Sequence, residues 1–330
     1  MVNAAVAGLG WWGRQITHSL KGSTQLRLVR AVEPNAAAHA DFARQHGLAL
    51  SATLAEALSD PAVEAVILCT PHGLHAAQVL EVAAAKRHVF CEKPLALSRA
   101  DAERSVAACR DAGVVLGIGH ERRFEPAVRR LREILRAGEL GPVLHARADF
   151  SHDKLAHVAA GDWRADPAQA PAAAMTAMGV HLTDLFLDLV GPIEEVHTIT
   201  SHLVSGRANG DGVSVHLRFA SGASGHVNAV LETPLYISLT IMGARGWAEI
   251  RNETHPDTPG PATLTVQPRG GERRVETFAW ENATLLNLLA FAETVRGRAD
   301  YPFTDAQKVG NVAVLDAVAR SAATRQPARV

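Results

Sequence analysis

The stretch VAGLGWWGRQ, residues 6–15, carries Gly8, Gly10 and Gly13 in the spacing G-x-G-x-x-G. It follows an apolar, strand-like run and opens the helix-like segment RQITHSLKG. The first glycine permits a sharp turn, the second lets a pyrophosphate approach the backbone, and the third lets the helix pack closely on the strand. The start of such a helix presents free N–H groups to an anion. The stretch therefore predicts a dinucleotide-binding loop.

An acidic residue stands where such a loop requires one. Glu33 ends the second strand-like run, LRLVRAVEP, 20 residues after Gly13. A carboxylate there accepts hydrogen bonds from ribose hydroxyls and repels a 2′-phosphate, which favours NAD over NADP. Arg30 or Arg44 could offset this repulsion, so NADP stays open as an alternative.

Two tryptophans, Trp11 and Trp12, lie inside the loop. Two interpretations are open for them. One ring packs under the loop while the other lines the coenzyme cleft, or both belong to the core.

Composition narrows the class of protein. The chain has 330 residues, of which 47% are hydrophobic, and its net charge is −1. That balance gives no support to nucleic-acid binding or to membrane binding. Three cysteines without a C-x-x-C pair suit a reducing compartment, and neither a signal peptide nor an apolar run long enough to cross a membrane is apparent. We expect a cytoplasmic protein.

The hydrophobic pattern changes along the chain and predicts two domains. Residues 1–122 alternate apolar strands with amphipathic helices, which predicts a Rossmann fold with a doubly wound parallel sheet. Residues 123–330 contain many runs of period-two alternation separated by glycine-rich turns. These runs predict an α+β domain with a large, mostly antiparallel, open-faced sheet. We expect the last helix, at about residues 304–323, to pack back on the Rossmann domain.

Two further segments carry a family resemblance. They are LCTPHGLHAAQVL at residues 68–80 and KRHVFCEKPLALS at residues 86–98. With the glycine loop, and with GHERRFEP and MGARGWAEI, they resemble the glucose-fructose oxidoreductase/inositol dehydrogenase/rhizopine-catabolism (Gfo/Idh/MocA) family. The resemblance covers essentially the whole chain. It implies an NAD(P)-dependent oxidoreductase that acts on a CH–OH group.

Lys93 is the first candidate catalytic residue. It follows a predicted parallel strand, at the edge where such sheets bind ligands, and Pro94 keeps the preceding residues extended. The resemblance implies that this lysine bonds the substrate hydroxyl beside the nicotinamide, and that the Lys-Pro bond is often cis. The alternative is a surface lysine paired with Glu92.

The resemblance also assigns coenzyme contacts. They fall on Thr70, Pro71, His75 and Glu92, in addition to Lys93. His72 and His75 have the spacing H-x-x-H, but no third ligand of suitable type is near in sequence, so we expect no metal.

His181 is the second candidate catalytic residue. It matches the histidine of an Asp-x-x-x-His motif that the family carries after a run of glycines. Ala177 stands at the aspartate position, and Ala172–Ala174 replace the glycines. The usual Lys/Asp/His relay is therefore in question, although an imidazole alone can exchange a proton near neutral pH. A histidine buried in the core is the other interpretation.

Four polar residues are candidate substrate contacts. Asp184 lies one helical turn after His181, where it could orient the imidazole, bond a substrate hydroxyl, or merely cap the helix or face solvent. Arg123 matches a recurrent arginine of the family and suits a carboxylate or a polyol. Trp163 and Arg164 precede the histidine helix, and similar pairs occur in some relatives.

The resemblance implies hydride transfer between a nicotinamide and a secondary alcohol or ketone of a sugar, cyclitol or related polyol. Dehydrogenation of a dihydrodiol from aromatic degradation is one alternative. A dinucleotide-binding sensor without turnover is another, and a glycosidase using transient oxidation is a third. The resemblance also implies that the second domain binds substrate and mediates oligomerisation, so we expect a homodimer or homotetramer that pairs through its sheet.

Overall fold

The computed structural model describes residues 1–159, 161–172 and 174–330. The chain divides into two compact units. The first unit comprises Met1–Glu121 and Thr284–Val309, and the second comprises Arg122–Ala283 and Gly310–Val330. A C-terminal segment thus belongs to the first unit, whereas the sequence placed everything after residue 122 in the second domain. Packing of the last helix on the Rossmann domain stays a prediction.

The first unit is built on a six-stranded parallel sheet with strand order β3-β2-β1-β4-β5-β6. The strands are β1 (Val2–Ala7), β2 (Leu26–Val32), β3 (Ala49–Ser51), β4 (Ala65–Leu68), β5 (His88–Cys91) and β6 (Leu116–Ile118). The helices are α1 (Trp11–Ser19), α2 (Ala36–Gln45), α3 (Leu54–Leu58), α4 (His72–Ala84), α5 (Arg99–Asp111) and α8 (Ala283–Val295). This order confirms the predicted doubly wound Rossmann fold.

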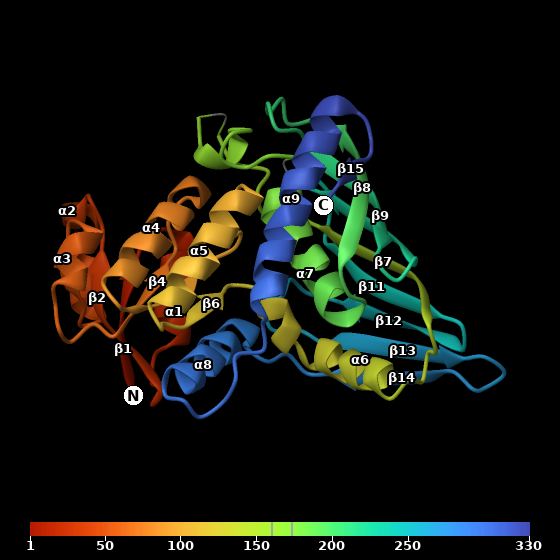
Figure 1. The fold of residues 1–330 in the computed structure, drawn as a ribbon, viewed down its shortest axis with the longest axis horizontal. Helices are drawn as coiled ribbons and strands as arrows, with labels where there is room; N and C mark the ends of the chain where they lie inside the picture. Colours follow the sequence, from red (N-terminus) through yellow and green to blue (C-terminus); the bar gives the residue numbers. More distant parts are fainter. Residues whose placement is uncertain (160, 173) are drawn as a thin grey trace. The chain divides into compact units, whose positions relative to one another are not determined.

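Local sequence explains the regular part of this unit. Every residue of β4, AVIL, is buried, as expected for a central parallel strand. Thr53 and Ser98 are the N-cap residues of helices α3 and α5, and their side chains accept the backbone N–H three residues on, each at 3.2 Å. Figure 1 shows α4 and α5 side by side next to the sheet.

Helix α8 completes the core of the first unit from the far end of the sequence. Leu288, Phe291 and Ala292 are buried in the same cluster as Phe90 of β5. The rings of Phe90 and Phe291 meet edge to face with their centroids 5.6 Å apart. An independent 122-residue nucleotide domain would therefore leave part of its core uncovered.

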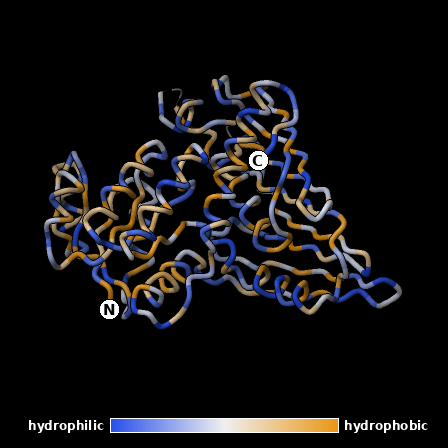
Figure 2. Tube along the Cα trace, viewed as in Figure 1, coloured by the Kyte–Doolittle hydropathy of each residue, from blue (hydrophilic) through white to orange (hydrophobic). Residues whose placement is uncertain are grey.

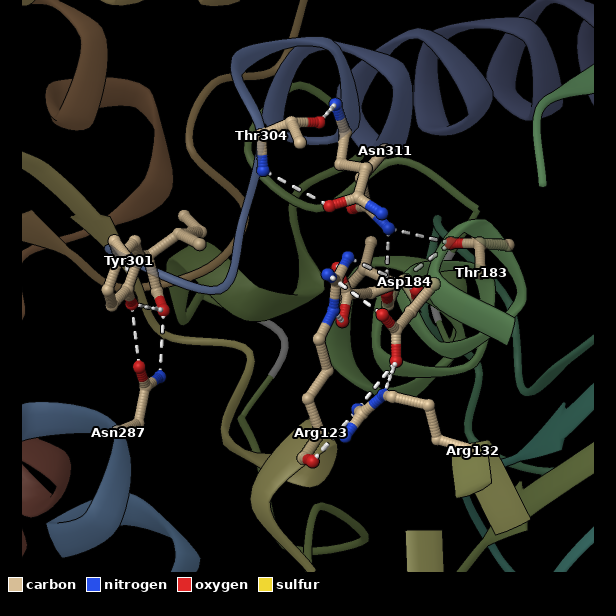
Figure 3. Close-up of polar contacts among 12 residues, drawn as sticks. Arg123, Arg132, Thr183, Asp184, Asn287, Tyr301, Thr304 and Asn311 are labelled. Atoms are coloured by element: carbon tan, nitrogen blue, oxygen red, sulfur yellow. Dashed lines mark hydrogen bonds and ion pairs between the residues drawn. The ribbon is translucent and has the colours of Figure 1, made fainter. Parts of the chain in front are cut away.

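Side chains form hydrogen bonds with the outer edge of β6, the last strand of this sheet. Ile118 donates its N–H to the Tyr301 hydroxyl at 3.1 Å, and its carbonyl accepts from Asn287 Nδ2 at 2.8 Å. The Tyr301 hydroxyl in turn donates to Asn287 Oδ1 at 2.6 Å, and Figure 3 shows the two side chains facing one another. The outward backbone groups of Ile118 are thus satisfied without another strand.

In the described part of the second unit, nine strands form one sheet in the order β14-β13-β12-β11-β7-β10-β9-β8-β15. The strands are β7 (Val143–Ser151), β8 (Ile193–Ser201), β9 (Gly212–Phe219), β10 (Ser224–Val230), β11 (Tyr236–Gly243), β12 (Gly246–Asn252), β13 (Ala262–Pro268), β14 (Arg274–Phe278) and β15 (Ala328–Arg329). Only the β7–β10 pair is parallel among these, so the predicted, mostly antiparallel sheet is confirmed.

Helices cover one face of this sheet. Figure 1 shows α6 (Pro126–Arg136) and α7 (Val180–Leu189) on the same side of it, with the second unit's part of α9 (Asp305–Thr324). The strands bury alternate residues on that side: in β9, Val213, Val215 and Leu217 are buried while His216 and Arg218 are exposed. The period-two pattern read in the sequence therefore corresponds to one covered face.

Figure 2 shows hydrophobic and hydrophilic residues interspersed along the chain in both units. Among the described residues, no helix combines the length and the apolar character needed to cross a membrane.

Candidate active site

The glycine loop joins β1 to α1, and each glycine has its own surroundings. Gly8 adopts φ +91°, and a Cβ there would lie 2.7 Å from the Cys69 carbonyl oxygen. A Cβ on Gly13 would lie 1.8 Å from the Gly8 carbonyl oxygen, so helix and loop pack with no spare room. A Cβ on Gly10, by contrast, would meet no protein atom within 4 Å. The surface beside Gly10 is open to a ligand, and the N-terminus of α1 begins there.

The two tryptophans of the loop differ. Trp12 packs against the core cluster of the first unit, whereas Trp11 is 57% exposed. Their ring centroids are 5.3 Å apart. Trp12 is therefore part of the structural support of the loop, and Trp11 is the ring that is accessible to a ligand.

Glu33 follows β2 and reaches the glycine loop. Its carboxylate accepts a hydrogen bond from the Leu9 backbone N–H, and its other oxygen lies 3.8 Å from Nε2 of His39. The acidic group that the dinucleotide motif requires is thus held beside the loop, and these residues fit an NAD coenzyme.

Arg30 and Arg44, the two arginines that the sequence suggested near Glu33, bind other acidic residues. Arg30 binds Asp60 at 2.7 Å and Ser51 at 2.9 Å, and Arg44 pairs with Asp41 on the surface. The structure instead places Arg14 here. Its Nε donates to the Leu9 carbonyl at 3.1 Å, and its Nη2 lies 3.3 Å from Nδ1 of His39. Nothing in the local sequence pattern distinguishes Arg14 from other helix arginines.

The loop after β4 is held by His75. This buried histidine has Nε2 2.9 Å from the Thr70 carbonyl and Nδ1 2.7 Å from the Pro94 carbonyl. A protonated ring donates to both carbonyls, and a neutral ring donates to one. Burial is the main cause that lowers the pKa of His75; the Lys93 charge adds to it, and the two carbonyls oppose it. His75 therefore ties the Thr70-Pro71 loop to the turn that follows Lys93.

Glu92 and Lys93 directly follow β5. The Lys93–Pro94 peptide bond is cis, and Lys93 is half-buried. Glu92 is only 6% exposed, and burial raises the pKa of its carboxyl from 4.5 to about 7, against the opposing effects of Trp12 and Lys93. Because β1, β4 and β5 are adjacent parallel strands, the Gly8, Thr70 and Lys93 segments all leave the same edge of the sheet.

His181 lies in the first turn of α7 and is 6% exposed. The preceding residues, Met175–Gly179, form a π-helical turn that contains Ala177. Such turns are rare and are frequent at functional sites. Of the alanines that replace the glycine run, Ala173 lies outside the described residues. The ring of His181 lies 6.0 Å from that of Phe150 at the end of β7.

Asp184 and Arg123, two predicted substrate contacts, bind each other. The guanidinium of Arg123 donates to both carboxylate oxygens of Asp184, and both side chains are 2% exposed (Figure 3). Asp184 thus neither caps α7 nor faces solvent. Contact of either residue with substrate stays a prediction.

Trp163 and Arg164 lie in a short 3₁₀ helix, Trp163–Ala165, and stack on one another. The Arg164 guanidinium lies 4.2 Å from the centroid of the Trp163 ring and pairs with Asp162 at 3.2 Å. Both residues are half-buried, and their role in substrate binding also stays a prediction.

Sequence reasoning missed His255 and Asp257. They follow β12 and lie beside His152, which follows β7. The spacing H-P-D after a predicted strand was the available signal. Among the described residues, no group of three or more His, Cys, Asp or Glu side chains is arranged to hold a metal ion.

Comparison with known families identifies the class of protein. Residues 2–120 match the oxidoreductase family with an NAD-binding Rossmann fold, and residues 128–249 match the Gfo/Idh/MocA C-terminal domain. The chain belongs to the Gfo/Idh/MocA oxidoreductase family, and its first unit is an NAD-binding Rossmann domain.

Individual relatives support this assignment. The chain is 30% identical over 307 residues to a 1,5-anhydro-D-fructose reductase of Ensifer adhaerens, covering 92% of this chain and 91% of the relative. It is 32% identical over 201 residues to a trans-1,2-dihydrobenzene-1,2-diol dehydrogenase of Mus musculus, covering 59% of this chain and 57% of that one. A levoglucosan dehydrogenase crystallised with NADH and levoglucosan shares the fold, with a TM-score of 0.87, 23% identity, and coverage of 100% of this chain and 99% of that one.

Proposed function

We propose that this NAD(P)-dependent oxidoreductase interconverts a secondary alcohol and the corresponding ketone of a sugar, a cyclitol or a related polyol. The observation that carries the proposal is the position of Lys93, which leaves β5 at the sheet edge that also bears the glycine loop. The names of its relatives point the same way, because they include a 1,5-anhydro-D-fructose reductase and a myo-inositol 2-dehydrogenase.

Each candidate side chain would have its own role in this reaction. When bound, NAD supplies the nicotinamide ring that accepts a hydride from the carbinol carbon. Lys93 stabilises negative charge that develops on the substrate oxygen. Lys93 or His181 takes the hydroxyl proton, a contribution of typically ~100- to 10,000-fold in rate. Arg123, Asp184, Trp163 and Arg164 are the proposed substrate contacts.

A dihydrodiol dehydrogenase is the second candidate, and the mouse relative is the specific observation in its favour. Both candidates are tested by following NADH absorbance while the protein is offered NAD with sugars, cyclitols, sugar acids and dihydrodiols. We expect oxidation of a polyol. Selective oxidation of dihydrodiols would favour the second candidate, and binding of NAD without turnover on any alcohol would indicate a sensor.

The Lys93→Ala variant makes the test specific. We expect it to keep its affinity for NADH and to lose turnover by about 100- to 10,000-fold. The matched control is Lys21→Ala, because Lys21 is exposed just after α1 and should leave turnover unchanged. Turnover within a few-fold of wild type in Lys93→Ala would contradict the assignment.

We also propose that the chain assembles as a homodimer or homotetramer through the face of the nine-stranded sheet opposite α6 and α7. Side chains such as Ile199 of β8, 64% exposed, are accessible. Light scattering on the purified protein tests this, and a monomer at micromolar concentration would contradict it.

A cytoplasmic location rests on the three free cysteines, Cys69, Cys91 and Cys109, and stays a prediction.

A further inference from the structure

Four side chains that can carry positive charge surround the ring of Phe150 in the second unit. The ring centroids of His152 and His255 each lie 5.4 Å from that of Phe150, and that of His181 lies 6.0 Å away. The guanidinium of Arg122 lies over the same ring at 5.0 Å. His181, the candidate catalytic histidine, therefore lies beside the same aromatic ring as His152 and His255, which the family motifs do not include.

The register of the sheet explains why these residues meet. Ser151 at the end of β7 pairs with Tyr236 at the start of β11, and Ile237 pairs with Asn252 at the end of β12. The segments that follow β7 and β12 therefore leave the sheet at the same end. His152 and His255 come from these two segments, and their ring centroids lie 5.0 Å apart.

A carboxylate orients His255. Its Nδ1 lies 2.6 Å from Oδ1 of Asp257 and 3.3 Å from the Asp257 backbone nitrogen. The short contact with a carboxylate oxygen requires a hydrogen on Nδ1, and it outweighs the longer contact with the backbone N–H. In the neutral ring Nε2 then holds the lone pair and can accept a proton. Lys154 Nζ at 2.6 Å and the Thr258 hydroxyl at 2.8 Å also donate to Oδ1 of Asp257, so the carboxylate remains ionised.

Both histidines are neutral near pH 7, with different tautomers. Burial is the main cause that lowers the pKa of His255; Lys154 and Arg122 add to it, and Asp257 opposes it. Burial, with the charges of His255 and Lys154, lowers the pKa of His152 to about 4. His152 Nδ1 accepts the Lys154 backbone N–H at 3.2 Å, so its Nε2 carries the hydrogen. The cluster thus presents one acceptor, on His255, beside one donor, on His152.

Asp257, which bonds His255, is comparable to the aspartate of the family's Asp-x-x-x-His motif, because each is a carboxylate beside a histidine. Ala177 stands where that motif has an aspartate, and Asp184 is bound by Arg123. Asp257 supplies a carboxylate to the imidazole of His255, which lies beside the same Phe150 ring. It comes from the segment after β12 and not from the segment before α7.

We propose that the Asp257–His255 pair is an acid–base pair of the substrate site. This proposal rests on the proposed function. In the oxidation direction the substrate O–H bond breaks, and its proton forms an N–H bond at Nε2 of His255. His255 then replaces Lys93 or His181 as the proton acceptor, and Lys93 keeps its role of stabilising negative charge on the substrate oxygen. The carbinol C–H bond breaks, and its hydrogen leaves with the electron pair as a hydride to NAD, the coenzyme of this family. Nε2 of His255 later releases the proton to solvent. Asp257 is a positioning residue that fixes the tautomer and stabilises the imidazolium.

Two variants test the pair in the full-length protein. We expect His255→Gln to lower kcat at least 100-fold while NADH affinity, from fluorescence titration, and the melting temperature stay near wild type. We expect Asp257→Asn to lower kcat at least tenfold, with little change in KM. It should also move the acid limb of the pH–rate profile to lower pH, because the carboxylate that raises the pKa of His255 is removed. His202→Gln, exposed just after β8, is the matched control.

A kcat for His255→Gln within threefold of wild type, or an unmoved pH profile for Asp257→Asn, would overturn the proposal. Nitrogen-15 NMR gives a readout that does not depend on turnover. We expect His255, assigned with the Gln variant, to carry its proton on Nδ1 at pH 7, and the opposite tautomer would also overturn it. Wild-type protein that oxidises no alcohol would instead reject the proposed function itself.

Discussion

Asp184 receives hydrogen bonds from Arg123 through both carboxylate oxygens, Oδ2 at 2.8 Å from Nε and Oδ1 at 2.7 Å from Nη2. The network continues to Asp188, which lies 3.5 Å from Nη1 of Arg123 and 2.6 Å from Nη2 of Arg132. Two carboxylates and two guanidinium groups thus balance in charge. This arrangement ties the start of the second unit, before α6, to α7, the helix that carries His181.

The first prediction concerns this buried pair. Replacing Arg123 by Met should lower the free energy of unfolding by about 3–5 kcal/mol, because it leaves Asp184 charged and buried without its main partner. Chemical denaturation measures the change. Arg99→Gln, which removes an ion pair to Glu103 with both side chains more than half exposed, should cost less than about 1 kcal/mol. A stable Arg123→Met protein with a raised KM would show a substrate contact instead.

The second prediction separates two glycines of the coenzyme loop. Gly13→Ala should disrupt the loop and abolish NADH binding, because its Cβ would lie 1.8 Å from the Gly8 carbonyl oxygen. Gly10→Ala should fold with an unchanged melting temperature, because its Cβ would meet no protein atom within 4 Å. NADH affinity should still fall about tenfold or more, because the methyl group occupies the space for the pyrophosphate. Equal NADH affinity in wild type and Gly10→Ala would show that the dinucleotide lies elsewhere.

The regular fold could be predicted from sequence because its signals are local. Apolar runs such as AVIL in β4 and alternation such as VSVHLRF in β9 are readable within a few residues. The membership of residues 284–309 in the first unit could not be predicted in this way. It depends on the contact of Phe291 with Phe90 and on the bonds of Asn287 and Tyr301 to Ile118, which link positions more than 160 residues apart.

The same distinction between local and long-range signals applies to the residues of the candidate site. The glycine loop, Glu33 and Lys93 each follow a strand of a known sheet type, so their positions follow from motif and topology. The partners of the polar residues in the second unit do not. Arg123 and Asp184 are 61 residues apart, and either could equally have faced a ligand. The pairing of His152 with His255 requires the β7–β11–β12 register, which no local pattern encodes.

The third prediction concerns coenzyme choice. Glu33→Gln should lower the preference for NAD over NADP at least tenfold in kcat/KM, because a neutral amide no longer repels a 2′-phosphate. Affinity for NAD should also fall, because the charge-assisted bond to the Leu9 N–H is weakened. Arg30→Gln is the control, since Arg30 is engaged by Asp60 and Ser51. An unchanged coenzyme ratio in Glu33→Gln would remove Glu33 from the ribose site.

The fourth prediction is a pH dependence of stability that comes from Glu92. Gly119 packs so closely on this carboxyl group that a Cβ there would lie 2.4 Å from Oε2, and the group is 6% exposed. Burial raises the pKa of Glu92 from 4.5 to about 7. The folded protein therefore holds this proton more tightly than the unfolded chain does. Between these two pH values folding takes up a proton, and the stabilisation present below pH 4.5 is lost as pH rises through 7.

The size of the effect follows from the shift. Each pKa unit corresponds to about 1.4 kcal/mol, so the ionised Glu92 lowers the free energy of unfolding by about 3 kcal/mol above pH 7. Glu92→Gln removes this contribution and leaves the other titrating groups in place. The difference between variant and wild type in urea denaturation should therefore grow by about 3 kcal/mol in favour of the variant from pH 4.5 to pH 8. Parallel stability curves for the two proteins would show that Glu92 stays ionised in the fold, through a tighter contact with the Lys93 charge.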